Sequence, residues 1–232
     1  MAYLNPKTFL QTLDRFLAHW EAVDAELAPA QLTLIPGYTR ASLKSARDEL
    51  SGLMTKVVEE ENDRQGLTGE RNIRRKALRP RMVQFRKLVA GLMPDSSYAR
   101  VLPDTPLADA AFPRWETAMV QFAGLWEMIE ADPPPGVPVP LLVAGGYGLA
   151  DFVSDANALR SVYTGLVGEE NDFVGALFDR DRVWNDAHSR LVQYRGVVAG
   201  SFELSHPLVR SLPRLSQPYK KRAKPVAPPP EA

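Results

Sequence analysis

The stretch Glu60-Glu61-Asn62-Asp63 returns as Glu169-Glu170-Asn171-Asp172, 109 positions further along the chain. At the same spacing residues 37–91 align without a gap with residues 146–200, and about 20 of the roughly 55 aligned pairs are identical. Identity at this level is far above chance, so the sequence indicates an internal duplication. We therefore expect repeat 1 over residues 1–103 and repeat 2 over residues 113–213, joined by a linker at about 94–113.

Each repeat opens with an amphipathic helix. Apolar residues recur three and four positions apart, which places them on one face of a helix. Residues 16–21 also match residues 122–127, so that Trp20 corresponds to Trp126. The expected core residues are Phe9, Leu13, Phe16, Leu17, Trp20, Val23 and Leu27 in repeat 1, and Trp115, Met119, Phe122, Leu125, Trp126 and Ile129 in repeat 2.

Two more segments with helical spacing follow in each repeat, and their connection is open to two interpretations. Gly66 and Gly69 lie in a stretch with few apolar residues, and Pro80 would interrupt a continuous helix. This pattern favours a helical hairpin, and the alternative is one helix of about 50 residues. We expect an all-α protein in which two tandem homologous three-helix units, each a helix plus a helical hairpin, form a helical bundle.

Composition excludes several classes of protein. The chain has 232 residues, 28 basic and 28 acidic side chains, 45% hydrophobic residues and no cysteine. The absence of cysteine excludes disulfide scaffolds, zinc ribbons and thiol catalysis. No signal peptide or run of about 18 apolar residues is present, so we expect a cytoplasmic protein without a membrane partner. Residues 214–232 are basic and rich in proline, which predicts a disordered tail.

The repeated charges predict structural ion pairs. In the helical register Glu61 and Glu170 fall on the inward stripe, where a carboxylate needs a cationic partner. The sequence does not decide which acid meets which arginine. The candidates are Glu61, Glu170, Asp63 and Asp172 on the acidic side, and Arg71, Arg180, Arg81, Arg190, Arg86 and Arg195 on the basic side.

A basic segment over residues 71–87 suggests a second function. Arginines along a helix can follow phosphates, and a basic tail can add to that binding. The alternative to a structural protein is therefore a polyanion- or nucleic-acid-binding protein. Its candidate residues are Arg71, Arg74, Arg75, Lys76, Arg79, Lys220, Lys221, Arg222 and Lys224.

Catalytic and metal-binding signals are weak. Carboxylates in helical bundles hold two metal ions when Glu-x-x-His motifs supply the remaining ligands. Only His19, His188 and His206 occur, and none lies three residues after a glutamate of the acidic motif. A carboxylate-bridged metalloprotein is thus the least favoured alternative, and we expect no catalytic residue and no cofactor. The favoured function is a non-enzymatic scaffold or protein-interaction module whose partner is a protein, itself or another.

Overall fold

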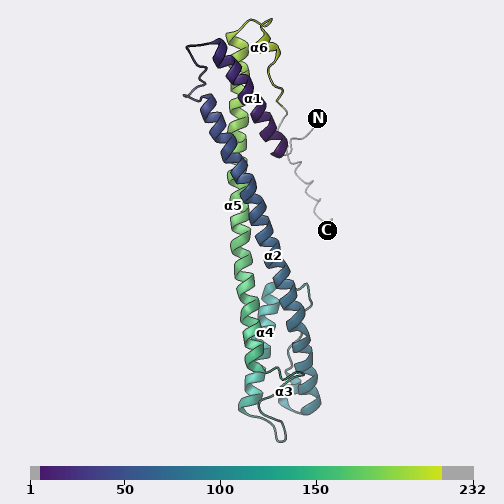
Figure 1. The fold of residues 1–232 in the computed structure, drawn as a ribbon. Coiled ribbons are helices and arrows are strands. Elements are labelled where there is room, and N and C mark those ends of the chain that lie inside the picture. The colour runs from purple at the N-terminus through teal and green to yellow at the C-terminus, as the bar shows by residue number, and fades with distance from the viewer. Residues whose placement is uncertain (1–5, 216–232) are drawn as a thin grey trace, which may run out of the picture. The chain divides into compact units, whose positions relative to one another are not determined.

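A computed structural model describes residues 6–215 of the chain (Figure 1). Within this range the regular elements are helices, together with two isolated β-bridges, so the all-α prediction is confirmed. The predicted tail lies outside the described residues from residue 216 onward. The helices are α1 (Pro6–Glu26), α2 (Arg40–Leu92), α3 (Ser97–Arg100), α4 (Phe112–Ala131), α5 (Leu149–Ser201) and α6 (Pro207–Arg210).

The predicted hairpins are wrong, because α2 and α5 are continuous helices of 53 residues each. Gly66, Gly69 and Pro80 all lie inside α2. A Cβ added to either glycine would meet no atom outside the local helix backbone within 4 Å, so both glycines face open space on an uninterrupted helix. Pro80 is exposed, and solvent can satisfy the backbone group that loses its partner there.

Two compact units divide the chain differently from the two repeats. Among the described residues, unit 1 contains 6–58 and 175–215, and unit 2 contains 59–174. The prediction of one unit within 1–103 and another within 113–213 is therefore corrected. Segments far apart in one continuous helix cannot fold back on each other, so the third segment of a repeat cannot cover its own first helix. Each unit instead combines segments from both repeats.

The core of unit 1 joins α1 to the second part of α5. Trp20 and Tyr194 are both fully buried, and their ring centroids lie 4.6 Å apart. His19, also on α1, accepts a hydrogen bond from the Tyr194 hydroxyl at its Nδ1 (2.7 Å) and donates from Nε2 to the carbonyl of Leu208 (2.8 Å). These bonds attach α6 to the same core.

The core of unit 2 joins α4 to the second part of α2. Trp126 stacks on Phe85 with ring centroids 4.4 Å apart, and its Nε1 donates to the carbonyl of Leu141 at 3.0 Å. Trp126 matches Trp20, and Phe85 matches Tyr194, in the alignment of the repeats. Corresponding residues thus make the central aromatic contact of each unit, and both contacts join one repeat to the other.

Candidate functional site

A tight turn precedes each long helix, and the repeated Gly-Tyr pair forms part of it. An isolated β-bridge joins Leu34 to Tyr38 before α2, and a second joins Val143 to Tyr147 before α5. The glycines at the two turns, Gly37 and Gly146, have φ angles of 69° and 73°. Side chains with a Cβ disfavour this left-handed region, which explains why glycine occupies both positions.

Arg81 fastens the turn of unit 2. Its Nη1 donates to the carbonyl of Ala144 (2.9 Å) and to Oε1 of Gln84 (3.1 Å). The guanidinium also lies over the ring of Tyr147, 4.6 Å from its centroid. Arg81 was predicted to pair with a carboxylate. It instead binds the backbone of the turn and the side chain of Gln84.

Arg190 makes the corresponding contacts in unit 1. It donates to the carbonyl of Ile35 (2.9 Å) and to Gln193, and it lies 5.0 Å from the ring centroid of Tyr38. Its Nε also lies 3.8 Å from Asp186, an acid that was not among the predicted partners. Both arginines are thus placed by the same local geometry.

The hydroxyl of Tyr38 gives unit 1 a testable response to alkali. Burial, followed by the charge of Asp186 and opposed by that of Arg190, raises the pKa of Tyr38 from 10.0 to about 12. Stability from the neutral phenol is complete below the unfolded pKa of about 10 and is lost as the pH rises through the folded pKa. We therefore expect the free energy of unfolding, measured by urea titration, to fall less between pH 10 and pH 12 in Tyr38→Phe than in the wild type. Identical pH profiles would contradict this assignment.

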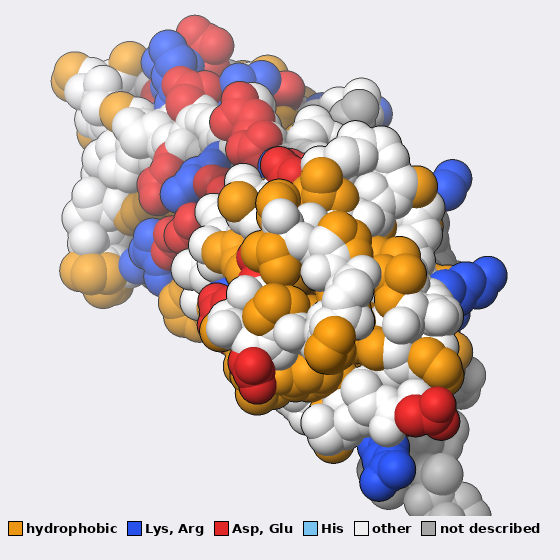
Figure 2. Space-filling model, turned by 90° about the horizontal axis from the view of Figure 1, so that it is seen from below, with side chains coloured by type: hydrophobic (Ala, Val, Ile, Leu, Met, Phe, Trp, Pro, Cys, Tyr) orange, Lys and Arg blue, Asp and Glu red, His pale blue; other side chains and the backbone are white. Residues whose placement is uncertain are grey.

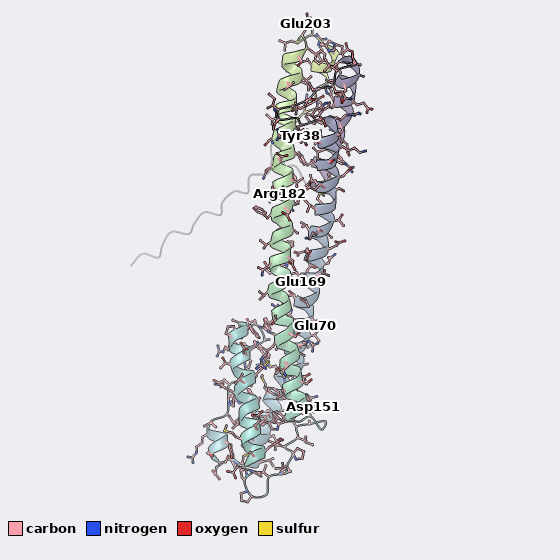
Figure 3. The ribbon with its side chains drawn as sticks, turned by 90° about the vertical axis from the view of Figure 1, so that its left-hand side faces the viewer. Tyr38, Glu70, Asp151, Glu169, Arg182 and Glu203 are labelled. Atoms are coloured by element: carbon pink, nitrogen blue, oxygen red, sulfur yellow. The ribbon has the colours of Figure 1, made fainter. Side chains whose placement is uncertain are left out.

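In unit 2 the acidic motif of repeat 1 lies against that of repeat 2, and Figure 3 labels Glu169 on α5 where α2 runs alongside. Arg64 of α2 bridges the two motifs, with 3.0 Å to Glu61 and 3.3 Å to Glu170. Its guanidinium also lies 5.1 Å from the ring centroid of Phe173. Hydrogen bonds from Gln65 and then Arg64 lower the pKa of Glu61.

The predicted pairing of these glutamates with repeated arginines is therefore wrong. Their partner Arg64 corresponds to Phe173 in repeat 2, so matching the repeats could not identify it. The side chains are also only partly covered, since 31% of Glu61 and 56% of Glu170 is exposed. Solvent can stabilise these charges, and no buried counter-ion is required.

The remaining predicted charges serve other contacts or none. The nearest polar partner is Asn72 for Arg71, Asp181 for Arg180 (2.6 Å) and Asp104 for Arg86 (3.5 Å). Within residues 8–215, Asp63, Asp172 and Arg195 form no ion pair. Helical periodicity predicts the face on which a side chain lies but not which neighbour it contacts, so the sequence could not determine these pairings.

Carboxylates of the two motifs also approach one another. Oxygen atoms of Glu60, Glu169 and Asp172 lie within 4.8 Å of each other. Loss of solvation, and then the charges of Asp63, Glu60 and Asp172, raise the pKa of Glu169. Residues 59–174 contain no histidine, so unit 2 cannot supply the Glu-x-x-His ligands of a di-iron bundle. Three partly exposed carboxylates do not by themselves define a metal site.

The raised pKa of Glu169, caused by loss of solvation and then by neighbouring acids, predicts a stabilising substitution. A carboxylate whose pKa is raised on folding weakens the native state at neutral pH, and this penalty disappears as the pH falls below the unfolded value of 4.5. Glu169→Gln should therefore raise the melting temperature at pH 7 and have no effect in acid. Glu170→Gln is the matched control and should lower it, because Glu170 pairs with Arg64. A shift of the melting temperature in the same direction for both variants would contradict this assignment.

The basic segment of α2 borders a cavity of about 800 Å³ in unit 2. Arg75 is only 8% exposed, and its two Nη atoms donate to the carbonyls of Ala108 (3.0 Å) and Ala110 (2.6 Å). Its guanidinium also lies 5.3 Å from the ring centroid of Trp115 and 5.2 Å from that of Tyr163. Arg75 therefore holds the linker between the repeats.

Other predicted polyanion-binding residues are engaged in the same way. Arg79 donates from Nε to the carbonyl of Pro106 (3.0 Å), and Arg74 pairs with Glu70 at 2.6 Å. The basic tail residues Lys220, Lys221, Arg222 and Lys224 lie outside the described residues. The excess of arginine in repeat 1 is thus explained in part by its contacts with residues 106–110. An open basic face along all of residues 71–87 is not what the structure contains.

Comparison with known proteins assigns no family to the chain. No protein-family model, no curated protein and no solved structure matches it. Within residues 6–215, no helix is both long and apolar enough to cross a membrane. Evidence about function therefore comes from the residues and their arrangement.

Proposed function

We propose that the protein is a non-enzymatic helical scaffold that assembles with proteins, a second copy of its own chain first, through one apolar end of unit 2. This end consists of the C-terminal part of α4, the residues after α3 and the proline-rich connection from residue 132 to residue 142. The observation that carries the proposal is the exposure of large apolar side chains there.

Figure 2 looks onto this end and shows hydrophobic side chains gathered over it. Met128 is 52% exposed, Val139 53%, Leu142 46% and Val101 60%. The hydroxyl of Tyr98 donates to the carbonyl of Asp132 at 3.0 Å, which attaches α3 to the end of α4. Contiguous apolar surface of this kind is uncommon on soluble monomers and is typical of interaction sites.

The repeated residues support an architectural role. Those that recur in both repeats include the glycines of the tight turns, the arginines that fasten these turns and the central aromatic residues of each core. Each of these has a structural contact that accounts for its type. Nucleophilic catalysis needs a nucleophile, a base and an orienting group within hydrogen-bond reach, and no repeated set of this kind is present in the sequence.

Net charge favours the chain itself as the first partner. The formal charge at pH 7 is zero, so two copies do not repel each other over long distances. Burial of apolar area then supplies the driving force for association. The proline-rich connection has no equal in repeat 1, where a shorter segment joins α1 to α2, so association through this end is a property of unit 2.

Sedimentation velocity over a series of concentrations tests this proposal. The wild type should show a mass that rises with concentration, and Leu142→Lys and Val139→Lys should weaken association about tenfold or more, because each buries a charge in the interface. Val167→Lys is the matched control, since Val167 is 65% exposed on α5 of the same unit. A monomer at every concentration, or an equal effect of Val167→Lys, would overturn the proposal.

The polyanion alternative stays a second proposal with narrower support. Arg71, Arg75, Lys76 and Arg79 border one cavity, but Arg75 and Arg79 already donate to backbone carbonyls, and Arg74 pairs with Glu70. Binding of heparin or DNA that weakens steeply with salt would support it. Absence of binding at low salt would remove it.

A further inference from the structure

We propose that the basic cavity of unit 2 binds a small organic phosphate, a function separate from assembly through the apolar end. The cavity lies between α2, the linker that precedes α4, and Tyr163 of α5. Its volume of about 800 Å³ is within the range of small-molecule sites. The side chains that define its chemistry are Arg71, Arg75, Lys76, Arg79 and Tyr163.

Charge in the cavity is one-sided. Four cationic side chains line it, and the one carboxylate in its wall is that of Asp109, which is exposed. Within residues 8–215 neither Arg75 nor Lys76 forms an ion pair. An excess of this size favours an anion with more than one negative charge, such as a phosphate monoester, over a single carboxylate.

Arg75 provides the deepest cation of the cavity. Arg75 as a whole is 8% exposed, and the partners of its guanidinium are two carbonyl oxygens and two aromatic faces, all of them uncharged groups. A desolvated charge without a counter-charge is costly, and an anion in the cavity would remove much of that cost. Its Nε is buried and has no hydrogen-bond partner in the protein.

Tyr163 supplies a second unpartnered donor. Its hydroxyl is buried without a hydrogen-bond partner, and its ring stacks on Phe112 with centroids 3.9 Å apart. Both orphaned groups, Nε–H of Arg75 and O–H of Tyr163, are donors. The oxygens of an ionised phosphate only accept hydrogen bonds, so they are of the type that these donors bind; both atoms are closed to solvent in the free protein, and a ligand reaches them only after neighbouring side chains shift.

The rest of the wall indicates the remainder of the ligand. Phe112, Pro80 and Ala108 contribute apolar surface to the same cavity. A phosphate alone would leave this surface in contact with water, whereas an aryl or alkyl ester would cover it. The ligand class is therefore a phosphate monoester with an apolar substituent.

Differences between the repeats coincide with this cavity. The residues that match Arg75, Lys76, Arg79 and Tyr163 in the other repeat are Trp184, Asn185, His188 and Met54. Arg75 and Arg79 differ from their counterparts in part because they hold the linker, whereas neither Lys76 nor Tyr163 donates a hydrogen bond to the linker within the described residues. The divergence is expected if one unit acquired a ligand that the other does not bind.

Isothermal titration calorimetry of the full chain with phenyl phosphate tests the proposal, with inorganic phosphate and phenol as comparisons. We expect phenyl phosphate to bind, inorganic phosphate to bind more weakly, and phenol to give no heat. Lys76→Gln and Tyr163→Phe should each weaken binding of phenyl phosphate about tenfold or more, the usual cost of losing a hydrogen bond to a charged group. Lys87→Gln, an exposed lysine of α2 outside the cavity, is the matched control and should bind as the wild type does.

Thermal unfolding without ligand shows that the variants are folded. Lys76 is exposed, and Tyr163→Phe removes a hydroxyl that has no partner, so neither change should lower the melting temperature. Absence of heat with both phosphates would overturn the proposal. An equal loss of affinity for phenyl phosphate in Lys87→Gln would also overturn it. So would binding of a heparin fragment, instead of phenyl phosphate, with an affinity that Tyr163→Phe leaves unchanged, because both results indicate a diffuse basic surface.

Discussion

Replacing Trp126 by alanine should lower the free energy of unfolding by about 3–5 kcal/mol, the usual cost of truncating a buried tryptophan. Trp126 is fully buried, stacks on Phe85 at 4.4 Å and donates a hydrogen bond to the carbonyl of Leu141. The substitution leaves a cavity and an unpaired buried carbonyl at the same time. Urea titration followed by circular dichroism measures the change.

A double-mutant cycle makes this prediction specific to the exchanged architecture. Trp126→Ala combined with Phe85→Ala should show a coupling energy of about 0.5–3 kcal/mol, because the two rings are in contact. Trp126→Ala combined with Tyr194→Ala should be additive within about 0.5 kcal/mol, because Tyr194 belongs to the other core. The opposite result, coupling to Tyr194 and none to Phe85, would mean that each repeat folds on itself and that the two units are wrong.

Gly66→Pro should destabilise the protein by about 3 kcal/mol or more, the usual cost of proline in a helix interior. Gly66 lies inside the continuous helix α2, where its N–H contributes to the helical hydrogen bonds and the ring of proline would collide with the preceding turn. In a hairpin, residue 66 would lie near the connection and the same substitution would be tolerated. The free energy of unfolding from urea titration distinguishes the two.

Gly66→Ala is the matched control at the same position. No atom lies within 4 Å of the Cβ it would add, so alanine should stabilise the helix by about 0.5–1 kcal/mol. A proline variant as stable as the wild type, or an alanine variant that is less stable, would show that the chain is not helical at this residue.

Much of the fold follows from the periodicity of the sequence. Of the predicted core positions of the first helix, Phe9, Leu13, Phe16, Trp20 and Val23 are fully buried, whereas Leu17 and Leu27 are only partly buried. The equivalent positions of α4, from Trp115 to Ile129, are buried as well. Local spacing decides which face of a helix is apolar, and that face is buried in whichever partner it finds.

The candidate sites were predictable only in part. Glu60 and Glu169 belong to the repeated acidic motif, so the alignment marks the segments that meet, but the predicted site residues were their neighbours Glu61 and Glu170. Arg64 and Tyr163 could not be found in this way, because the other repeat has Phe173 and Met54 at these positions. Their roles depend on contacts with distant parts of the chain, and a comparison of the two repeats does not reveal such contacts.

The amino-acid order alone predicted the helical class, the similarity of residues 37–91 to residues 146–200 and the apolar faces of α1 and α4. Tertiary structure decided that residues 40–92 and 149–201 are each unbroken, and hence that the first helix of one repeat is covered by the last segment of the other. In a hairpin the third segment covers the first helix of its own repeat, and with continuous helices it covers that of the other repeat. Both arrangements bury the same side chains against equivalent surfaces, so the spacing of apolar residues in the sequence cannot distinguish them. The choice between them depends on the free energy of the turn at residues 61–72, which remains helical here.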